Sequence, residues 1–106
     1  TSPTAYLAVP VALGVEARTG AEMRLRPMFL GGVMQGSGNK PPGTVPAKAK
    51  YLNRDLQRCA AHIGIPMYFN PAFPLNTLGV LRATTGMTDL AEQRRFVITL
   101  FEAAWG

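Results

Sequence analysis

The 106-residue sequence has one cysteine, Cys59, and one histidine, His62. A single thiol cannot form an internal disulfide, so a disulfide-stabilised secreted scaffold is excluded and a reducing, cytoplasmic setting is expected. With one histidine and no carboxylate cluster at ligand spacing, we predict no metal site. Cys59 falls on the apolar stripe of a predicted helix, so we expect it in the core.

Long apolar runs and long basic runs are also missing. No segment approaches the ~20 apolar residues that a membrane-spanning helix needs, and the start lacks the basic segment of a signal peptide. The net charge is +5, but the 11 basic residues are scattered, and we expect Arg94-Arg95 on a solvated face. No zinc-finger spacing or RNA-binding motif is present, so nucleic acid is not an expected partner. A carboxylate-rich small ligand suits the charge equally well.

A helix with a hydroxyl at its start is predicted near the N-terminus. Apolar spacing favours a helix over residues 4–18, with Ser2 or Thr4 as its cap and Pro3 in its first turn. Pro10 is expected to kink it. Backbone N–H groups and the positive end of the helix dipole converge at such a start, which suits an anion such as a thiolate. Because Cys59 is elsewhere, the thiol would come from a ligand.

The following segments alternate between irregular and helical patterns. Residues 22–30 begin with the alternation of a strand that ends near Pro27. The glycine-rich and proline-rich residues 31–46 predict a long loop. Residues 46–63 have the apolar stripe of an amphipathic helix.

Two further helices are predicted after an extended segment over residues 65–74. They cover Leu75–Thr85 and Thr88–Trp105, with Thr88 capping the second. One strand cannot form a stable sheet by itself. We therefore expect an α/β fold whose other strands are missing from this sequence or are supplied by another subunit, which leaves a fragment dominated by helices.

Several motifs carry a resemblance to a known family. They are Ser2-Pro3-x-x-Tyr6-Leu7, Leu25-Arg26-Pro27, Ser37-Gly38-Asn39-Lys40-Pro41-Pro42-Gly43, Tyr51-Leu52-x-x-Asp55-Leu56, Gly64-Ile65-Pro66 and Phe101-x-x-x-Trp105. With these motifs the chain resembles the 2-hydroxychromene-2-carboxylate isomerase and kappa-class glutathione transferase family. The serine-glycine-asparagine stretch and its spacing from Ser2 are the most specific part.

The resemblance implies a thioredoxin-like fold with an inserted helical domain, as in DsbA-type oxidoreductases. Residues 1–30 would be part of the thioredoxin-like half, and residues 31–106 would be the connecting loop and the inserted helical domain. The first strand would precede Ser2, and the second thioredoxin half would follow Gly106. In DsbA-like relatives the turn at residues 2–5 carries Cys-x-x-Cys, and neither sulfur is present here. Dithiol exchange is therefore excluded at this turn.

The resemblance also assigns a glutathione site. Ser2 would be the catalytic residue, because its hydroxyl would hold the glutathione thiolate. Pro3 and Thr4 would belong to the same turn, Asn39 would contact the peptide of glutathione, and Lys48 would attract its carboxylates. Without the resemblance, Ser2 is a plain helix cap, Asn39 a turn residue and Lys48 a solvated lysine.

The implied function is a glutathione-dependent isomerase of the 2-hydroxychromene-2-carboxylate type. The thiolate would add reversibly to a conjugated enone, allow rotation about the former double bond and then leave. The alternative is a kappa-class transferase that conjugates glutathione to an electrophile, and a second alternative is a non-catalytic fragment or interaction module. The partners would be glutathione and a small aromatic acid or electrophile; a homodimer stays open. Whether Tyr6, Tyr51, Phe73 and Trp105 form a core or a substrate pocket also stays open.

Overall fold

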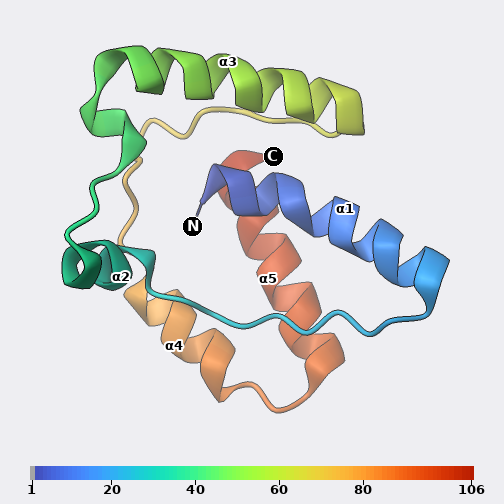
Figure 1. The fold of residues 1–106 in the computed structure, drawn as a ribbon. Coiled ribbons are helices and arrows are strands. Elements are labelled where there is room, and N and C mark those ends of the chain that lie inside the picture. Colours follow the sequence, from blue (N-terminus) through green and yellow to red (C-terminus); the bar gives the residue numbers. More distant parts are fainter. Residues whose placement is uncertain (1) are drawn as a thin grey trace.

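The computed structural model describes residues 2–106, and the regular elements in that range are helical. They are α1 (Pro3–Thr19), α2 (Leu30–Ser37), the 3-10 turn η1 (Pro42–Thr44), α3 (Pro46–Ile63), α4 (Leu78–Gly86) and α5 (Leu90–Trp105). Figure 1 shows α1 running beside α3 and crossing α5, with the start of α1 close to the end of α5. The strand expected over residues 22–30 is absent, so the α/β prediction is not met within the described range.

The start and end of α1 follow the local signals in the sequence. Ser2 has extended backbone angles (φ −94°, ψ 131°) and its side chain accepts a hydrogen bond from the Ala5 N–H. Pro3 fits the first helical position because a proline has no N–H to leave unpaired. Gly20 ends the helix with a φ of 73°, a left-handed conformation that favours glycine. Pro10 lies inside the helix, which runs unbroken to Thr19.

Residues 20–29 are extended but form no ladder. The alternation that predicted a strand is real, because Met23, Leu25 and Pro27 are half-buried while the residues between them are exposed. A strand also needs a neighbouring strand to receive its backbone hydrogen bonds. The Met23 N–H instead donates to the Glu16 carboxylate. The alternation therefore predicted the burial of these residues correctly. It predicted a paired strand wrongly, because this segment has no neighbouring strand within residues 2–106.

The loop predicted over residues 31–46 is interrupted by two short helices. α2 contains Gly31, Gly32 and Gly36, which sequence propensity disfavours in a helix. The ring of Phe29 packs against the first turn, so that a Cβ on Gly32 would lie 2.8 Å from the Phe29 ring. The contact explains why glycine fits at this point, and the loop prediction holds only for the short segments around η1.

α3 has the predicted bounds, Pro46–Ile63, and ends at Gly64 in the left-handed region with a φ of 81°. Leu56 and Ala60 are buried on its apolar stripe. Cys59 is exposed, which corrects the prediction that it belongs to the core. It lies at the rim of a groove between α3 and α1 rather than beneath it.

α4 and α5 begin later than predicted. The Asn76 side chain accepts from the Leu78 N–H at 3.2 Å, and this local turn delays the start of α4. Asp89, not Thr88, caps α5, because its carboxylate accepts from the Glu92 N–H at 2.9 Å.

The core is small and lies at the N-terminal end of α1. Its buried members come from α1, α3, the segment after α3 and the end of α5: Tyr6, Leu7, Leu56, Ala60, Met67 and Trp105. Trp105 is the most enclosed side chain, at 1% exposure. The Tyr6 hydroxyl donates to the Pro66 carbonyl at 2.7 Å and so ties α1 to the segment after α3.

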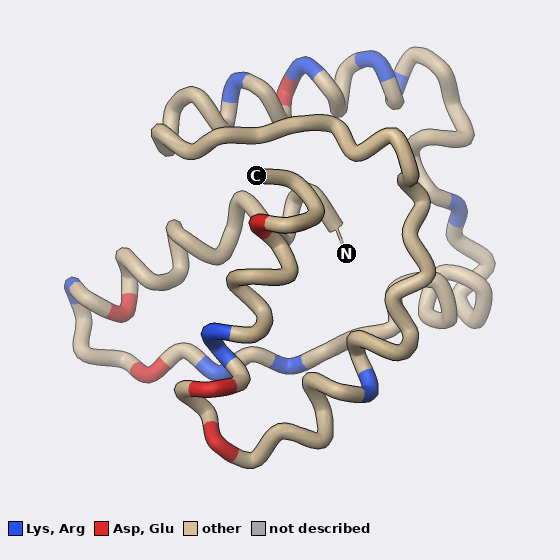
Figure 2. Tube along the Cα trace, turned by 180° about the vertical axis from the view of Figure 1, so that it is seen from behind, with Lys and Arg blue, Asp and Glu red and all other residues tan. Residues whose placement is uncertain are grey.

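The other end of α1 is held by charge. The Arg94 guanidinium donates to both carboxylate oxygens of Glu16, at 2.8 and 2.9 Å, and to the Met23 carbonyl at 3.0 Å. These bonds join α1, the extended segment and α5. Arg94 is therefore not on a solvated face, as its sequence context had indicated, although Arg95 is exposed. The remaining basic residues are distributed over several elements (Figure 2).

Candidate functional site

Ser2 stands where the first turn of α1 opens to solvent. Its Oγ accepts from the Ala5 N–H at 3.3 Å, and its carbonyl accepts from the Tyr6 N–H at 3.0 Å. The first turn contains no acidic residue. An anion placed here would meet the hydroxyl and the positive end of the helix dipole, and the first turn itself contributes no carboxylate to repel it.

Pro3 and Thr4 complete this turn in different ways. Pro3 is half-buried and supplies no N–H, whereas Thr4 is exposed. Thr4 lines a groove of about 380 Å³ between α1 and α3, which also includes Leu7, Leu56 and Cys59. The Ser2 turn thus borders a mainly apolar groove.

Asn39 and Lys48 are placed on separate elements. Asn39 is exposed between α2 and η1, and its side-chain oxygen accepts from the Lys40 N–H at 2.9 Å. Lys48 is exposed in the first turn of α3. Within residues 2–106 no hydrogen bond or ion pair joins either residue to Ser2. Both side chains therefore have polar groups available for a ligand.

The aromatic residues divide between core and surface. Tyr6 and Trp105 are buried, whereas Tyr51 and Phe73 are exposed. The Phe73 ring still lies at a tilt beside Trp105, with ring centroids 5.5 Å apart, and the Phe69 ring lies 6.3 Å from the same indole. The Trp105 Nε1 is buried and has no hydrogen-bond partner in the described part of the chain.

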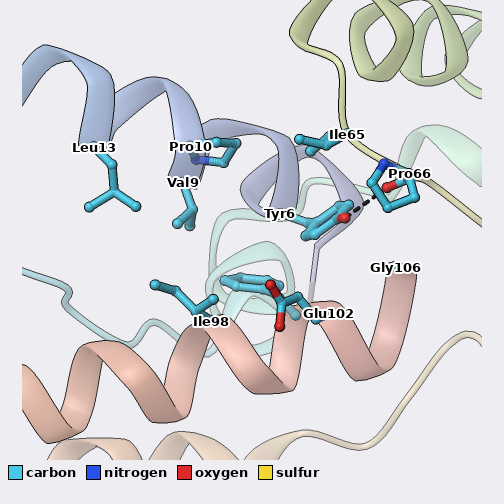
Figure 3. Close-up of a pocket in the computed structure, with 10 residues that line it drawn as sticks. Tyr6, Val9, Pro10, Leu13, Ile65, Pro66, Ile98, Glu102 and Gly106 are labelled. Carbon is cyan, nitrogen blue, oxygen red and sulfur yellow. Dashed lines mark hydrogen bonds between the residues drawn. The ribbon is translucent and has the colours of Figure 1, made fainter.

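A second cavity, of about 470 Å³, lies between α1 and α5 (Figure 3). The hydroxyl of Tyr6 and the carboxylate of Glu102 face it from the two helices. Burial, followed by the negative charge of Glu102, raises the pKa of Tyr6. Sequence reasoning missed this cavity because its walls come from segments about ninety residues apart. The i, i+3 spacing of Ile98 and Phe101 on the apolar face of α5 was a local signal for one wall.

Residues 2–106 offer neither a metal-binding cluster nor a membrane-spanning helix. No group of three or more histidine, cysteine, aspartate or glutamate side chains is arranged to hold a metal ion there. None of the helices in this range is both long and apolar enough to cross a membrane.

The arrangement of α1 and the helices after it matches a known domain. The family model of the DsbA-like thioredoxin domain matches residues 1–106. The chain therefore belongs to the DsbA-like thioredoxin family, in the part of it that holds kappa-class glutathione transferases and 2-hydroxychromene-2-carboxylate isomerase. The family resemblance carried by the motifs is confirmed.

Individual relatives support this assignment over part of their length. The chain is 35% identical over 72 residues to human glutathione S-transferase kappa 1 and 40% identical over 73 residues to the Caenorhabditis elegans protein of that name. Each match covers 68% of this chain and 32% of the relative. A solved 2-hydroxychromene-2-carboxylate isomerase superposes with a TM-score of 0.86 at 28% identity, over 99% of this chain and 52% of that one. The chain thus spans about a third of these transferases and about half of the isomerase.

Proposed function

We propose that this chain contributes the thiolate-binding part of a glutathione-dependent enzyme, an isomerase of the 2-hydroxychromene-2-carboxylate type. The observation that carries the proposal is the Ser2 turn: a hydroxyl and a helix start with no acidic residue in the first turn. The names of the relatives, glutathione transferases and an isomerase, support the same chemistry. We place this activity in the cytoplasm, where thiols stay reduced.

The task of Ser2 is to favour the thiolate form of glutathione. The Ser2 hydroxyl accepts from the Ala5 N–H and retains its own hydrogen, which it can donate to a sulfur atom. Lowering a thiol pKa by about two units from about 8.5 needs about 2.7 kcal/mol of preference for the anion. A charge-assisted hydrogen bond together with a helix N-terminus supplies that order of stabilisation.

Glutathione, when bound, supplies the nucleophilic sulfur that adds reversibly to a conjugated enone. The other residues of the proposed site act on binding rather than on the sulfur. Lys48 offers an exposed ammonium for the carboxylates of the tripeptide, and Asn39 offers an amide for its peptide groups. Pro3 shapes the turn, and Thr4 stands between it and the apolar groove, where the second substrate would lie.

A kappa-type transferase is the second candidate. It is favoured by one observation: the two relatives that are 35% and 40% identical to this chain over 68% of its length are both kappa-class transferases. The two reactions share the thiolate and differ in whether the sulfur leaves the product. Isomerisation would return free glutathione, whereas conjugation would consume one glutathione for each product molecule.

Calorimetric titration of reduced glutathione into the chain tests the proposal. The informative variant is Ser2→Asp, because aspartate keeps the N-cap but places a negative charge at the proposed position of the sulfur. We expect this variant to lose binding while its helical circular dichroism is retained. Thr85→Asp, which places the same negative charge at an exposed hydroxyl position on α4, is the matched control and should bind normally. Equal binding by Ser2→Asp and the parent chain would refute the role of Ser2, and no binding by the parent would favour the interaction module.

A further inference from the structure

The cavity between α1 and α5 is independent of the Ser2 turn. Its volume of about 470 Å³ falls in the range of roughly 300–1,000 Å³ that is typical of small-molecule sites. Val9 and Leu13 of α1 face Ile98 of α5 across it, and Ile65-Pro66 borders one end (Figure 3). Most of this wall is hydrocarbon, so the body of a ligand would be apolar.

The polar groups of the cavity indicate the sign of the charge that a ligand would carry. The Tyr6 hydroxyl already donates to the Pro66 carbonyl at 2.7 Å. The Glu102 carboxylate faces the same space and forms no hydrogen bond or ion pair within residues 2–106. No lysine or arginine lines the cavity. Arg94, on the same helix, is held by Glu16. The cavity therefore offers one uncompensated negative charge at the edge of an apolar wall.

We propose that this cavity binds a small amphipathic cation, with its hydrocarbon body between α1 and α5 and its ammonium group at Glu102. Such a ligand would bury apolar surface against Val9, Leu13 and Ile98 and would pair with the free carboxylate. Glutathione, which carries net negative charge, does not suit this cavity. The inference does not depend on the proposed function of Ser2.

Three probes with the same hydrocarbon body and different charges test the proposal. They are phenylbutylammonium, phenylbutanol and phenylvalerate, titrated into the isotope-labelled chain and followed by NMR. We expect shift changes at Val9, Leu13 and Ile98. The ammonium probe should bind roughly three- to tenfold more tightly than the alcohol, since a partly exposed ion pair contributes modestly, and the carboxylate should bind most weakly.

Glu102→Gln separates charge from shape, because it keeps the size of the side chain at an exposed position where folding is not at risk. This variant should bind the ammonium and the alcohol equally. Glu92→Gln, which neutralises another exposed acid on α5, should keep the preference for the ammonium. The proposal is overturned if no probe shifts the cavity residues, if the three probes bind alike, or if the preference survives in Glu102→Gln.

Discussion

The two ends of α1 are held to the rest of the molecule by different forces. At the N-terminal end, Tyr6 and Leu7 are buried in an apolar cluster with Trp105. At the C-terminal end, the contact is the ion pair of Glu16 with Arg94. Both side chains of this pair keep substantial exposure, 24% and 31%.

This difference indicates which end of α1 contributes most of the stability and which end mainly fixes the orientation of the helix. Apolar burial is non-directional and makes a large contribution for an enclosed indole, whereas a partly exposed ion pair contributes little but fixes geometry through its fork of donors. The Ser2 turn therefore stands on the more strongly packed end of α1, where a positioned hydroxyl is useful.

The largest effect is expected from breaking the apolar end. Trp105→Ala removes the most enclosed side chain, at 1% exposure, and should lower the free energy of unfolding by about 3–5 kcal/mol. Urea denaturation followed by circular dichroism measures this loss. Tyr51→Ala is the control, because Tyr51 is 63% exposed and its change should stay within about 0.5 kcal/mol. Similar losses for the two variants would mean that the core does not lie at this end.

The sequence predicted the apolar end of α1 well because its signals are local. A serine, a proline and the spacing of Tyr6 and Leu7 are enough to place the start of the helix. α3 was predicted for the same reason, between Pro46 and Gly64. α2 was missed because its glycines have low helix propensity, and no local pattern indicates that Gly32 must fit against the Phe29 ring.

The charged end was not predictable from the sequence. Glu16 and Arg94 are 78 positions apart, and no local pattern distinguishes Arg94 from Arg95. Their ion pair also crosses the predicted division between residues 1–30 and 31–106, a division that remains a prediction. The DsbA-like fold itself was predictable only through the motifs, since the isolated strand pattern of residues 22–30 has no partner here. Ser2, Pro3, Thr4, Asn39 and Lys48 were located correctly on their elements, and their roles remain predictions.

Breaking the charged end should have a smaller effect that depends on pH. Arg94→Gln removes the fork to Glu16 and the bond to the Met23 carbonyl, and should lower the urea midpoint less than Trp105→Ala does. The bonds from Arg94 and the Met23 N–H hold the pKa of Glu16 below its ordinary value of 4.5. Because the pKa of Glu16 is lower in the folded state than in the unfolded state, the ionised carboxylate stabilises the folded chain at pH values above 4.5. This stabilisation is lost as the pH falls below 4.5 toward the folded-state pKa.

The matched control for this end is Arg95→Gln, an exposed neighbour on the same helix. The parent chain and Arg95→Gln should both lose stability on acidification below the ordinary glutamate pKa. Arg94→Gln should lose less, because its Glu16 no longer has a cationic partner. If acidification destabilises Arg94→Gln and the parent equally, the ion pair does not contribute to holding α1.

The smallest effect is expected from the N-cap of α5, which determines where this helix begins and therefore how Arg94 is aligned with Glu16. Asp89 caps α5 about one turn before Arg94, with its carboxylate 2.9 Å from the Glu92 nitrogen. Asp89→Ala should lower the free energy of unfolding by about 1 kcal/mol, because an orphan N–H and the favourable charge at the helix start both lose their partner. Thr88→Ala, which changes the residue that the sequence alone suggested as the cap, should have almost no effect in the same urea titration. The reverse ranking would show that α5 begins at Thr88, so that the alignment of Arg94 with Glu16 is set one residue earlier.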